Sequence, residues 1–144
     1  TLETANFSIN YNQLANPKKN KEMSYTLEYP EMKGAIFLSY RRLDDDLDKL
    51  TEDAKRLSYE HAVKADNIVE QPFVNPESKV YGSLFEVQGN AASQTQFFVT
   101  DSTTHFLTGS VYFYTKPNYD SILPAAAYLQ NDIRNIMETL RWKE

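Results

Sequence analysis

Residues 101–105 bring together three side-chain types that are used in nucleophilic catalysis. Asp101, Ser102 and His105 lie in the stretch FFVTDSTTHFLTGS (97–110), and His105 is one of only two histidines in the chain. A serine nucleophile needs a base within hydrogen-bond reach and donors for the oxyanion. A hydrolase would combine these three residues with the second histidine, His61. The same residue types also suit a turn, because Asp and Ser side chains bond to nearby backbone amides.

The sequences on either side of 101–104 favour the turn. SQTQFFVT (93–100) and THFLTGSVYFYT (104–115) are typical of strands, and the four residues DSTT have a common length for a hairpin loop. The G-x-S-x-G elbow that exposes a serine nucleophile is missing. Alternation predicts large apolar side chains on one face of each strand: Phe97, Val99, Leu107, Val111 and Phe113. The turn is therefore the preferred interpretation, and the hydrolase remains the alternative.

A long helix is predicted around the second histidine, from Leu43 to about Glu70. Three acidic residues at 44–46 open it, where carboxylates cap free amides and complement the helix dipole. Because His61 lies on its apolar stripe, we expect this side chain to be buried against the sheet and hydrogen-bonded. The stripe recurs at three- and four-residue steps: Leu43, Leu47, Leu50, Ala54, Leu57, His61, Ala65 and Ile68.

Polar residues near the end of this predicted helix raise a second possibility. His61 and Lys64 are neighbours on a helical surface, and together with Asp66 they could form a polar site with a loop of the sheet. The preferred interpretation is a buried histidine beside a solvated salt-bridge face. The alternative binding cluster would comprise six residues: His61, Lys64, Asp66, Asn90, Asp101 and His105.

Neither a metal nor a cofactor is expected. The Asp residues at 44, 46 and 48 imitate the first ligands of a calcium loop, but Lys49 and Lys55 stand where that loop needs Gly and Glu. Zinc would need ligands of the HExxH or cysteine type, and the chain has no Cys. Its four glycines are isolated, unlike those of a phosphate-binding loop.

Composition narrows the classes of function further. A chain of 144 residues with 41% hydrophobic and 13% aromatic residues predicts one packed domain. The net charge is −5, and the densest basic run (Lys18, Lys19 and Lys21) resembles a solvated loop, so nucleic-acid binding is not expected. No apolar stretch approaches the roughly 18–20 residues that span a bilayer.

The order of elements predicts an α+β fold. Strands are expected at 5–11, 24–30 and 34–40 before the first helix, and at 79–89, 93–100 and 104–115 after it. A second helix follows Asp120, with the apolar stripe Ala126, Leu129, Ile133, Ile136 and Leu140. The order β-β-β-α-β-β-β-α suits an antiparallel sheet with both helices packed on one face. We expect a single domain over 1–144, with an N-terminal strand and basic loop at 1–24 and the core at 25–144.

Several long stretches resemble the gliding-motility lipoprotein family GldD of Bacteroidetes. They are EDAKRLSYEHAVKADNI (52–68), the segment 75–113 that begins NPESKVYGSLFEVQG, PNYDSILP (117–124) and DIRNIMETLRW (132–142). The shorter matches EYP (28–30) and GAIFLSY (34–40) extend the resemblance upstream. It covers roughly residues 25–143 and is looser around ANFSINY.

This resemblance implies an exported lipoprotein, anchored by a lipidated cysteine upstream of Thr1. It implies a periplasm-facing domain that binds envelope proteins of the gliding apparatus and its linked type IX secretion system. The family offers no established catalytic residue, and relatives occur in non-motile members of the phylum. The order of strands and helices is also similar to a PsbP-type sandwich, which is an analogy of topology and does not give function.

We therefore expect a non-catalytic accessory or assembly domain. Two alternatives remain open: a hydrolase that uses His61, Asp101, Ser102 and His105, and a small-molecule binding module with a Tyr-lined pocket between sheet and helices.

Two short motifs resemble the acceptor signal for O-glycosylation of exported Bacteroidetes proteins. They are Asp101-Ser102-Thr103 and Asp120-Ser121-Ile122. Ser102 is the preferred site, because a hairpin tip leaves room for a sugar in water. Ser121 is expected to cap the second helix.

Overall fold

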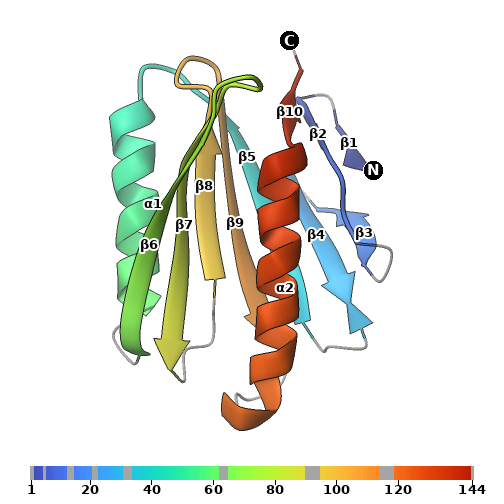
Figure 1. The fold of residues 1–144 in the computed structure, drawn as a ribbon. Coiled ribbons are helices and arrows are strands. Elements are labelled where there is room, and N and C mark those ends of the chain that lie inside the picture. Colours follow the sequence, from blue (N-terminus) through green and yellow to red (C-terminus); the bar gives the residue numbers. More distant parts are fainter. Residues whose placement is uncertain are drawn as a thin grey trace.

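Seven antiparallel strands form the main sheet of the domain, in the order β3-β4-β5-β9-β8-β7-β6 (Figure 1). The computed structural model describes residues 2–4, 6–12, 15–20, 23–30, 34–61, 65–89, 95–113 and 119–143, and the side chains of 57–61, 65–68, 87–89, 112–113 and 119–127 lie outside this description. The strands are β3 (Asn16–Lys19), β4 (Ser24–Tyr29), β5 (Gly34–Arg42), β6 (Ala65–Asn75), β7 (Val80–Gly89), β8 (Thr95–Thr100) and β9 (His105–Phe113).

A second, small sheet joins the two ends of the chain. It consists of β1 (Leu2–Glu3), β2 (Phe7–Ile9) and β10 (Arg141–Trp142), with β2 in the middle. Phe7 and Ile9 are almost completely buried in the same hydrophobic cluster as the centre of the main sheet. The N-terminal segment therefore contributes to the main core.

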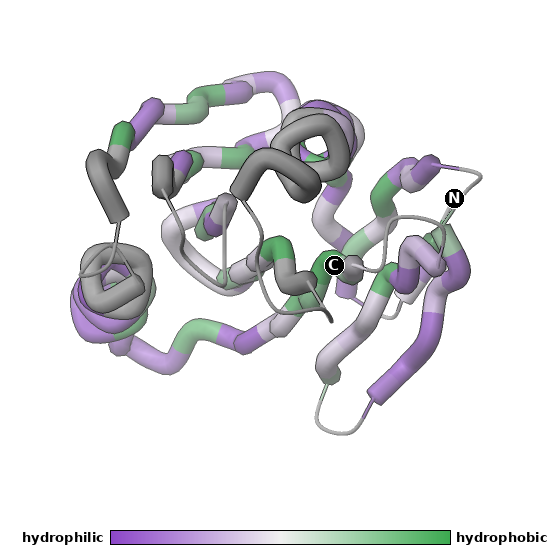
Figure 2. The backbone as a smooth tube through the Cα atoms, turned by 90° about the horizontal axis from the view of Figure 1, so that it is seen from below, coloured by the Kyte–Doolittle hydropathy of each residue, from purple (hydrophilic) through white to green (hydrophobic). Residues whose placement is uncertain are grey.

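The two helices cover opposite faces of the main sheet. α1 is Leu47–His61 and α2 is Tyr119–Thr139. In a view along the strands, the two helices are seen down their axes and lie on different sides of the sheet (Figure 2). Adjacent residues of the central strands pack against different helices. The cluster on the α2 side includes Leu84, Phe97 and Leu107. The cluster at the start of α1 includes Phe85, Phe98 and Phe106.

The prediction that both helices share one face is therefore wrong. Successive side chains of a strand point to opposite faces, so neighbouring large apolar residues make both faces of the sheet hydrophobic. Each hydrophobic face of the sheet must therefore be buried by a helix. The antiparallel α+β class itself is confirmed.

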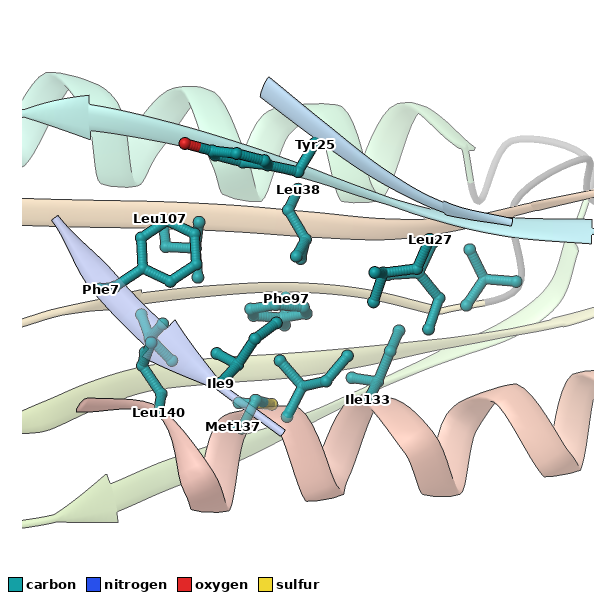
Figure 3. Close-up of a cluster of buried hydrophobic side chains, with 14 of the residues drawn as sticks. Phe7, Ile9, Tyr25, Leu27, Leu38, Phe97, Leu107, Ile133, Met137 and Leu140 are labelled. Carbon is teal, nitrogen blue, oxygen red and sulfur yellow. The ribbon is translucent and has the colours of Figure 1, made fainter. Parts of the chain in front are cut away.

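The larger core lies between the sheet and α2. Met137 joins the predicted stripe of α2, and β2 supplies side chains from the other end of the chain (Figure 3). The described members of the predicted stripe are all buried: Leu129, Ile133, Ile136 and Leu140. The side chain of Ala126 lies outside the described residues.

The long helix predicted over 43–70 is only partly correct. The helix ends at His61, and residues 65–75 form the edge strand β6, paired with β7. This segment is rich in the β-branched and aromatic residues that favour strands. An edge strand also tolerates Pro72, because one side of its backbone has no neighbouring strand. Hydrophobic spacing alone did not distinguish the two structures.

The basic run near the N-terminus is also a strand where it is described. β3 contains Lys18 and Lys19, is exposed along its length, and pairs with β4. The expectation of a loop there is wrong, because the backbone of this segment bonds to β4 while its charged side chains stay in water.

Gly109 in β9 lies directly beneath an aromatic ring. It is the cross-strand partner of Phe97 in β8. A Cβ atom at position 109 would lie 2.1 Å from that ring, closer than any side chain allows. The glycine therefore creates the space that Phe97 occupies in the core.

Candidate binding cleft

A cleft of about 580 Å³ opens at the end of the sheet where residues 101–104 connect β8 to β9, near the top of Figure 1. The turn 76–79 between β6 and β7 borders it, as do Arg42 at the end of β5 and the strand β10. The site therefore lies where several strands end and α2 passes into β10.

Asp101 organises the turn that forms one wall of the cleft. Its Oδ1 accepts hydrogen bonds from the backbone N–H groups of Thr103 (3.1 Å), Thr104 (2.8 Å) and His105 (2.8 Å). Ser102 has a φ of 73°, in the left-handed region that few residues other than glycine adopt. The predicted hairpin turn is thus confirmed, and its carboxylate supplies the acceptor that a tight turn needs.

The pKa of Asp101 reflects these contacts. Burial acts to raise the pKa of this carboxyl, but the three backbone N–H groups and the nearby His105 together hold it below its ordinary value. The carboxylate therefore stays charged and is committed to the backbone.

His105 forms the floor of the cleft and is only 4% exposed. Its Nδ1 is 2.6 Å from the hydroxyl of Tyr40, and its ring stacks on the indole of Trp142 with centroids 4.9 Å apart and planes 1° apart. The indole N–H donates to the carbonyl of Lys79 at 2.9 Å. These contacts hold β5, β9, β10 and the turn 76–79 together.

The hydroxyl of Tyr40 is also shaped by this environment. Burial raises the pKa of Tyr40, the guanidinium of Arg42 acts to lower it, and the carboxylate of Asp101 raises it. The hydroxyl stays protonated and serves as a hydrogen-bonding group.

The walls of the cleft carry more cations than anions. Its acidic residues are Glu77 and Asp101, and its basic residues are Arg42, Lys79, Arg141 and Lys143. Arg141 donates to the carbonyls of Glu138 and Leu140 at the end of α2, and Lys143 forms a long ion pair of 3.8 Å with Glu3. In the part of the chain that is described, Arg42 and Lys79 form no ion pair.

The structure separates the residues of the hypothetical catalytic triad. Asp101 and His105 both line the cleft, but the side chain of Asp101 bonds to backbone amides. Ser102 is exposed and lines a different, smaller pocket beside Leu47 and Asp48 at the start of α1. The three groups are close in sequence and do not line one pocket.

Of the predicted six-residue polar cluster, Asp101 and His105 line the same cleft, whereas the described backbone of Asp66 and of His61 lies away from it. Val74 of β6 pairs with Tyr81 of β7, which pairs in turn with Thr100 of β8, so Val74 lies at the Asp101 end of the sheet. Asp66 is eight residues from Val74 along β6, about 26 Å away. α1 likewise runs away from the cleft and ends at His61. Lys64, Asn90 and the side chains of His61 and Asp66 lie outside the described residues, so the burial of His61 stays a prediction.

The glycosylation motifs differ in their surroundings. Ser102 is exposed at the hairpin turn, where modification remains a prediction. Ser121 is the third residue of α2, so the expectation that it caps the helix is wrong: the helix begins two residues earlier, at Tyr119. Its side chain is not described.

The described residues contain no group of three His, Asp or Glu that could hold a metal ion. The acidic residues before α1 have a local role, since Oδ1 of Asp46 accepts the backbone N–H of Asp44 at 2.9 Å. Neither described helix is long and apolar enough to cross a membrane.

Sequence patterns did not identify the basic and indole side chains of the cleft, or the tyrosine that bonds to its floor: Arg42, Lys79, Arg141, Lys143, Trp142 and Tyr40. Tyr40 and His105 are 65 residues apart in sequence, and no motif links them. The one available signal was that Trp142 is the only Trp of the chain.

Fold and cleft together define an α+β domain with a cationic cleft at one end of an antiparallel sheet. The family described as "Gliding motility lipoprotein GldD" matches residues 1–142. The chain therefore belongs to this family of gliding-motility lipoproteins. The match includes the N-terminal segment that carries the buried Phe7 and Ile9. Neither a curated protein nor a solved structure matches the chain.

Proposed function

We propose that this domain is a non-catalytic accessory of the gliding machinery that works by binding envelope proteins. It faces the periplasm, is held to the membrane by a lipid anchor, and assists assembly of the gliding apparatus or of the linked type IX secretion system. The observation that carries this proposal is the cleft, whose Asp and His serve as fixed structural groups.

The geometry of those groups supports binding over hydrolysis. In a Ser-His-Asp mechanism the carboxylate orients the imidazole and the imidazole takes the proton of the serine. Here Oδ1 of Asp101 bonds to three backbone amides, and Nδ1 of His105 faces the hydroxyl of Tyr40. Ser102 lines a separate pocket.

The alternative of a small-molecule module with a Tyr-lined pocket receives less support. A Tyr-lined pocket was expected between sheet and helices, whereas this cleft lies at the end of the sheet. Its aromatic lining comes from Trp142 and His105.

A direct test is an assay for hydrolysis with ester, peptide and glycoside substrates. We expect the purified domain to show no turnover. Turnover that is lost in Ser102→Ala or His105→Ala, while both variants keep the circular dichroism of the wild type, would overturn the non-catalytic assignment.

The binding role is tested by chemical crosslinking of the lipidated protein in its native envelope, followed by purification and mass spectrometry. We expect components of the gliding or secretion machinery to be enriched over a control lipoprotein of similar abundance. Equal recovery of these components with the control would contradict the accessory role.

A further inference from the structure

We infer that the cleft at the end of the sheet binds a carboxylate-rich peptide segment of a protein partner. This inference rests on the proposed function and adds the chemistry of what is bound. It follows from the unpaired cations of the cleft, the state of its carboxylates, its aromatic lining and the helix end that borders it.

The cations of the cleft are poorly neutralised within the domain. Arg42 and Lys79 are exposed and have no ion-pair partner among the described residues. The pair Lys143–Glu3 is long and exposed, and such surface pairs contribute little. Together with Arg141, these cations gather around one cleft of a chain whose net charge is −5. A local excess of positive charge on an acidic protein favours an anionic partner.

The acidic residues of the cleft do not cancel this excess. Asp101 directs its carboxylate to three backbone N–H groups, which stabilise its charge within the turn. Glu77 is the remaining carboxylate of the wall. An incoming carboxylate therefore meets Arg42 and Lys79, which form no ion pair with the residues that the structure describes.

The shape and lining of the cleft suit a peptide side chain. Its volume of about 580 Å³ falls within the range of ligand pockets, which is about 300–1,000 Å³. The guanidinium of Arg42 matches a carboxylate in a bidentate geometry. Trp142, fixed by its stacking on His105 and its bond to Lys79, offers an apolar surface to the methylene groups of a Glu side chain.

The end of α2 at the cleft favours a carboxylate over a phosphate. Phosphate sites are typically built from helix N-termini, where free N–H groups face the ligand. Here the C-terminal end of α2 adjoins the cleft without lining it: the partly negative carbonyls of Glu138 and Leu140 accept hydrogen bonds from Arg141, which does line it. That end opposes a doubly charged anion more strongly than a singly charged one.

The test measures fluorescence anisotropy of a labelled peptide in which Glu alternates with Gly, titrated with the intact domain at low salt. A peptide with Gln in place of Glu is the ligand control. The test variant is Arg42→Gln with Lys79→Gln. The matched control is Arg41→Gln with Lys49→Gln, which removes the same charge from two exposed cations outside the cleft.

We expect the Glu peptide to bind the wild type and the Gln peptide to bind at least about tenfold more weakly, a difference of about 1.4 kcal/mol, since hydrogen bonds to charged groups are stronger than neutral ones. The Arg42/Lys79 variant should lose at least about tenfold in affinity by the same reasoning. The Arg41/Lys49 variant should stay within about twofold of the wild type, because exposed charges away from the ligand are screened. Equal urea midpoints for the two variants show that folding is not the cause.

Three results would overturn the inference: no binding of the Glu peptide, an equal loss in both variants, or displacement by inorganic phosphate at concentrations where acetate has no effect. If the Glu peptide does not bind but the domain still crosslinks to envelope partners, only the inference of an acidic peptide ligand is refuted. Hydrolytic turnover dependent on Ser102 or His105 refutes the proposed function instead.

Discussion

Two half-buried carboxylates of this domain have opposite environments. Asp101 lies in the turn beside the cleft, where three backbone N–H groups donate to it. Asp132 lies on α2, where the amide of Asn12 is 3.4 Å from its Oδ1. Oδ2 of Asp132 and the hydroxyl of Tyr29 are buried and close enough to influence each other's pKa, but neither has a hydrogen bond of good geometry with a residue that the structure describes.

The two carboxyl groups consequently have pKa values shifted in opposite directions. Burial acts on both, yet the backbone donors lower the pKa of Asp101 below 3.8. Burial raises the pKa of Asp132 above 3.8, although Tyr29 and Asn12 act to lower it. Tyr29 itself has a raised pKa, because of burial and then the charge of Asp132. The number of fixed donors, more than the degree of burial, decides which form each site stabilises.

The largest effect is expected from removing the well-satisfied carboxylate. Asp101→Ala leaves three backbone N–H groups of a tight turn without their acceptor, so we expect the free energy of unfolding to fall by about 2–3 kcal/mol. Urea denaturation followed by circular dichroism measures it. Asp101→Asn is the control, because its side-chain oxygen can still accept, and it should lose less. Equal stability of Asp101→Ala and the wild type would refute the role given to this turn.

The pH dependence separates the same variants. A folded pKa below 3.8 means that Asp101 contributes its full stability above that pH and loses it as the pH falls through the folded pKa. The difference between the wild type and Asp101→Asn should therefore shrink below pH 3.8. A difference that stays constant down to acid denaturation would contradict the lowered pKa.

The opposite sign is expected at Asp132. Because its folded pKa is raised, the wild type loses stability as the pH rises from 3.8 through the folded pKa, and the loss persists above it. Asp132→Asn removes this loss and supplies an amide that can bond to the hydroxyl of Tyr29. We expect a gain of about 1 kcal/mol at pH 7 that disappears below pH 3.8. Thermal unfolding across this pH range checks it, and destabilisation at pH 7 would contradict it.

The smallest effect is expected from Tyr29→Phe, which removes a buried hydroxyl without a hydrogen bond. Stability should rise by a few tenths of a kcal/mol, about the size of removing one unpaired polar group with its ring retained. In the Tyr29→Phe background the gain from Asp132→Asn should be smaller, since the new amide has lost its partner. A double-mutant cycle measures this coupling, and full additivity would show that the two groups do not interact.

Local patterns predicted much of the fold. Runs typical of strands predicted β4, β5, β7, β8 and β9, and the helical stripe of α2 was correct at every position whose side chain is described. The helical pattern failed at 65–70, because two apolar positions in register with the stripe, Ala65 and Ile68, belong to a segment that pairs with β7 as an edge strand. It also failed to place α1, because the assignment of a helix to one face depends on contacts between distant segments.

The cleft was predictable only in part. Asp101 and His105 stood out because their residue types carry chemistry and they are close in sequence. Tyr40 and Trp142 meet His105 only after β5, β9 and β10 have assembled, so no local signal could indicate them. The unpaired state of Arg42 and Lys79 is likewise a property of the folded surface.

The neighbouring pairs of large apolar residues in the central strands have a consequence for how the hairpins align. In a sheet with one wet face, slipping a strand by one residue turns its hydrophobic set to water, and that penalty selects the correct pairing. Between β8 and β9 a slip would exchange Phe97 for Phe98, and one covered face for the other. The burial of apolar side chains therefore distinguishes only weakly between the correct pairing of β8 with β9 and a pairing shifted by one residue. The selection depends on features that occur once: the space that Gly109 leaves for the ring of Phe97, and the Asp101 turn that fixes where the chain reverses.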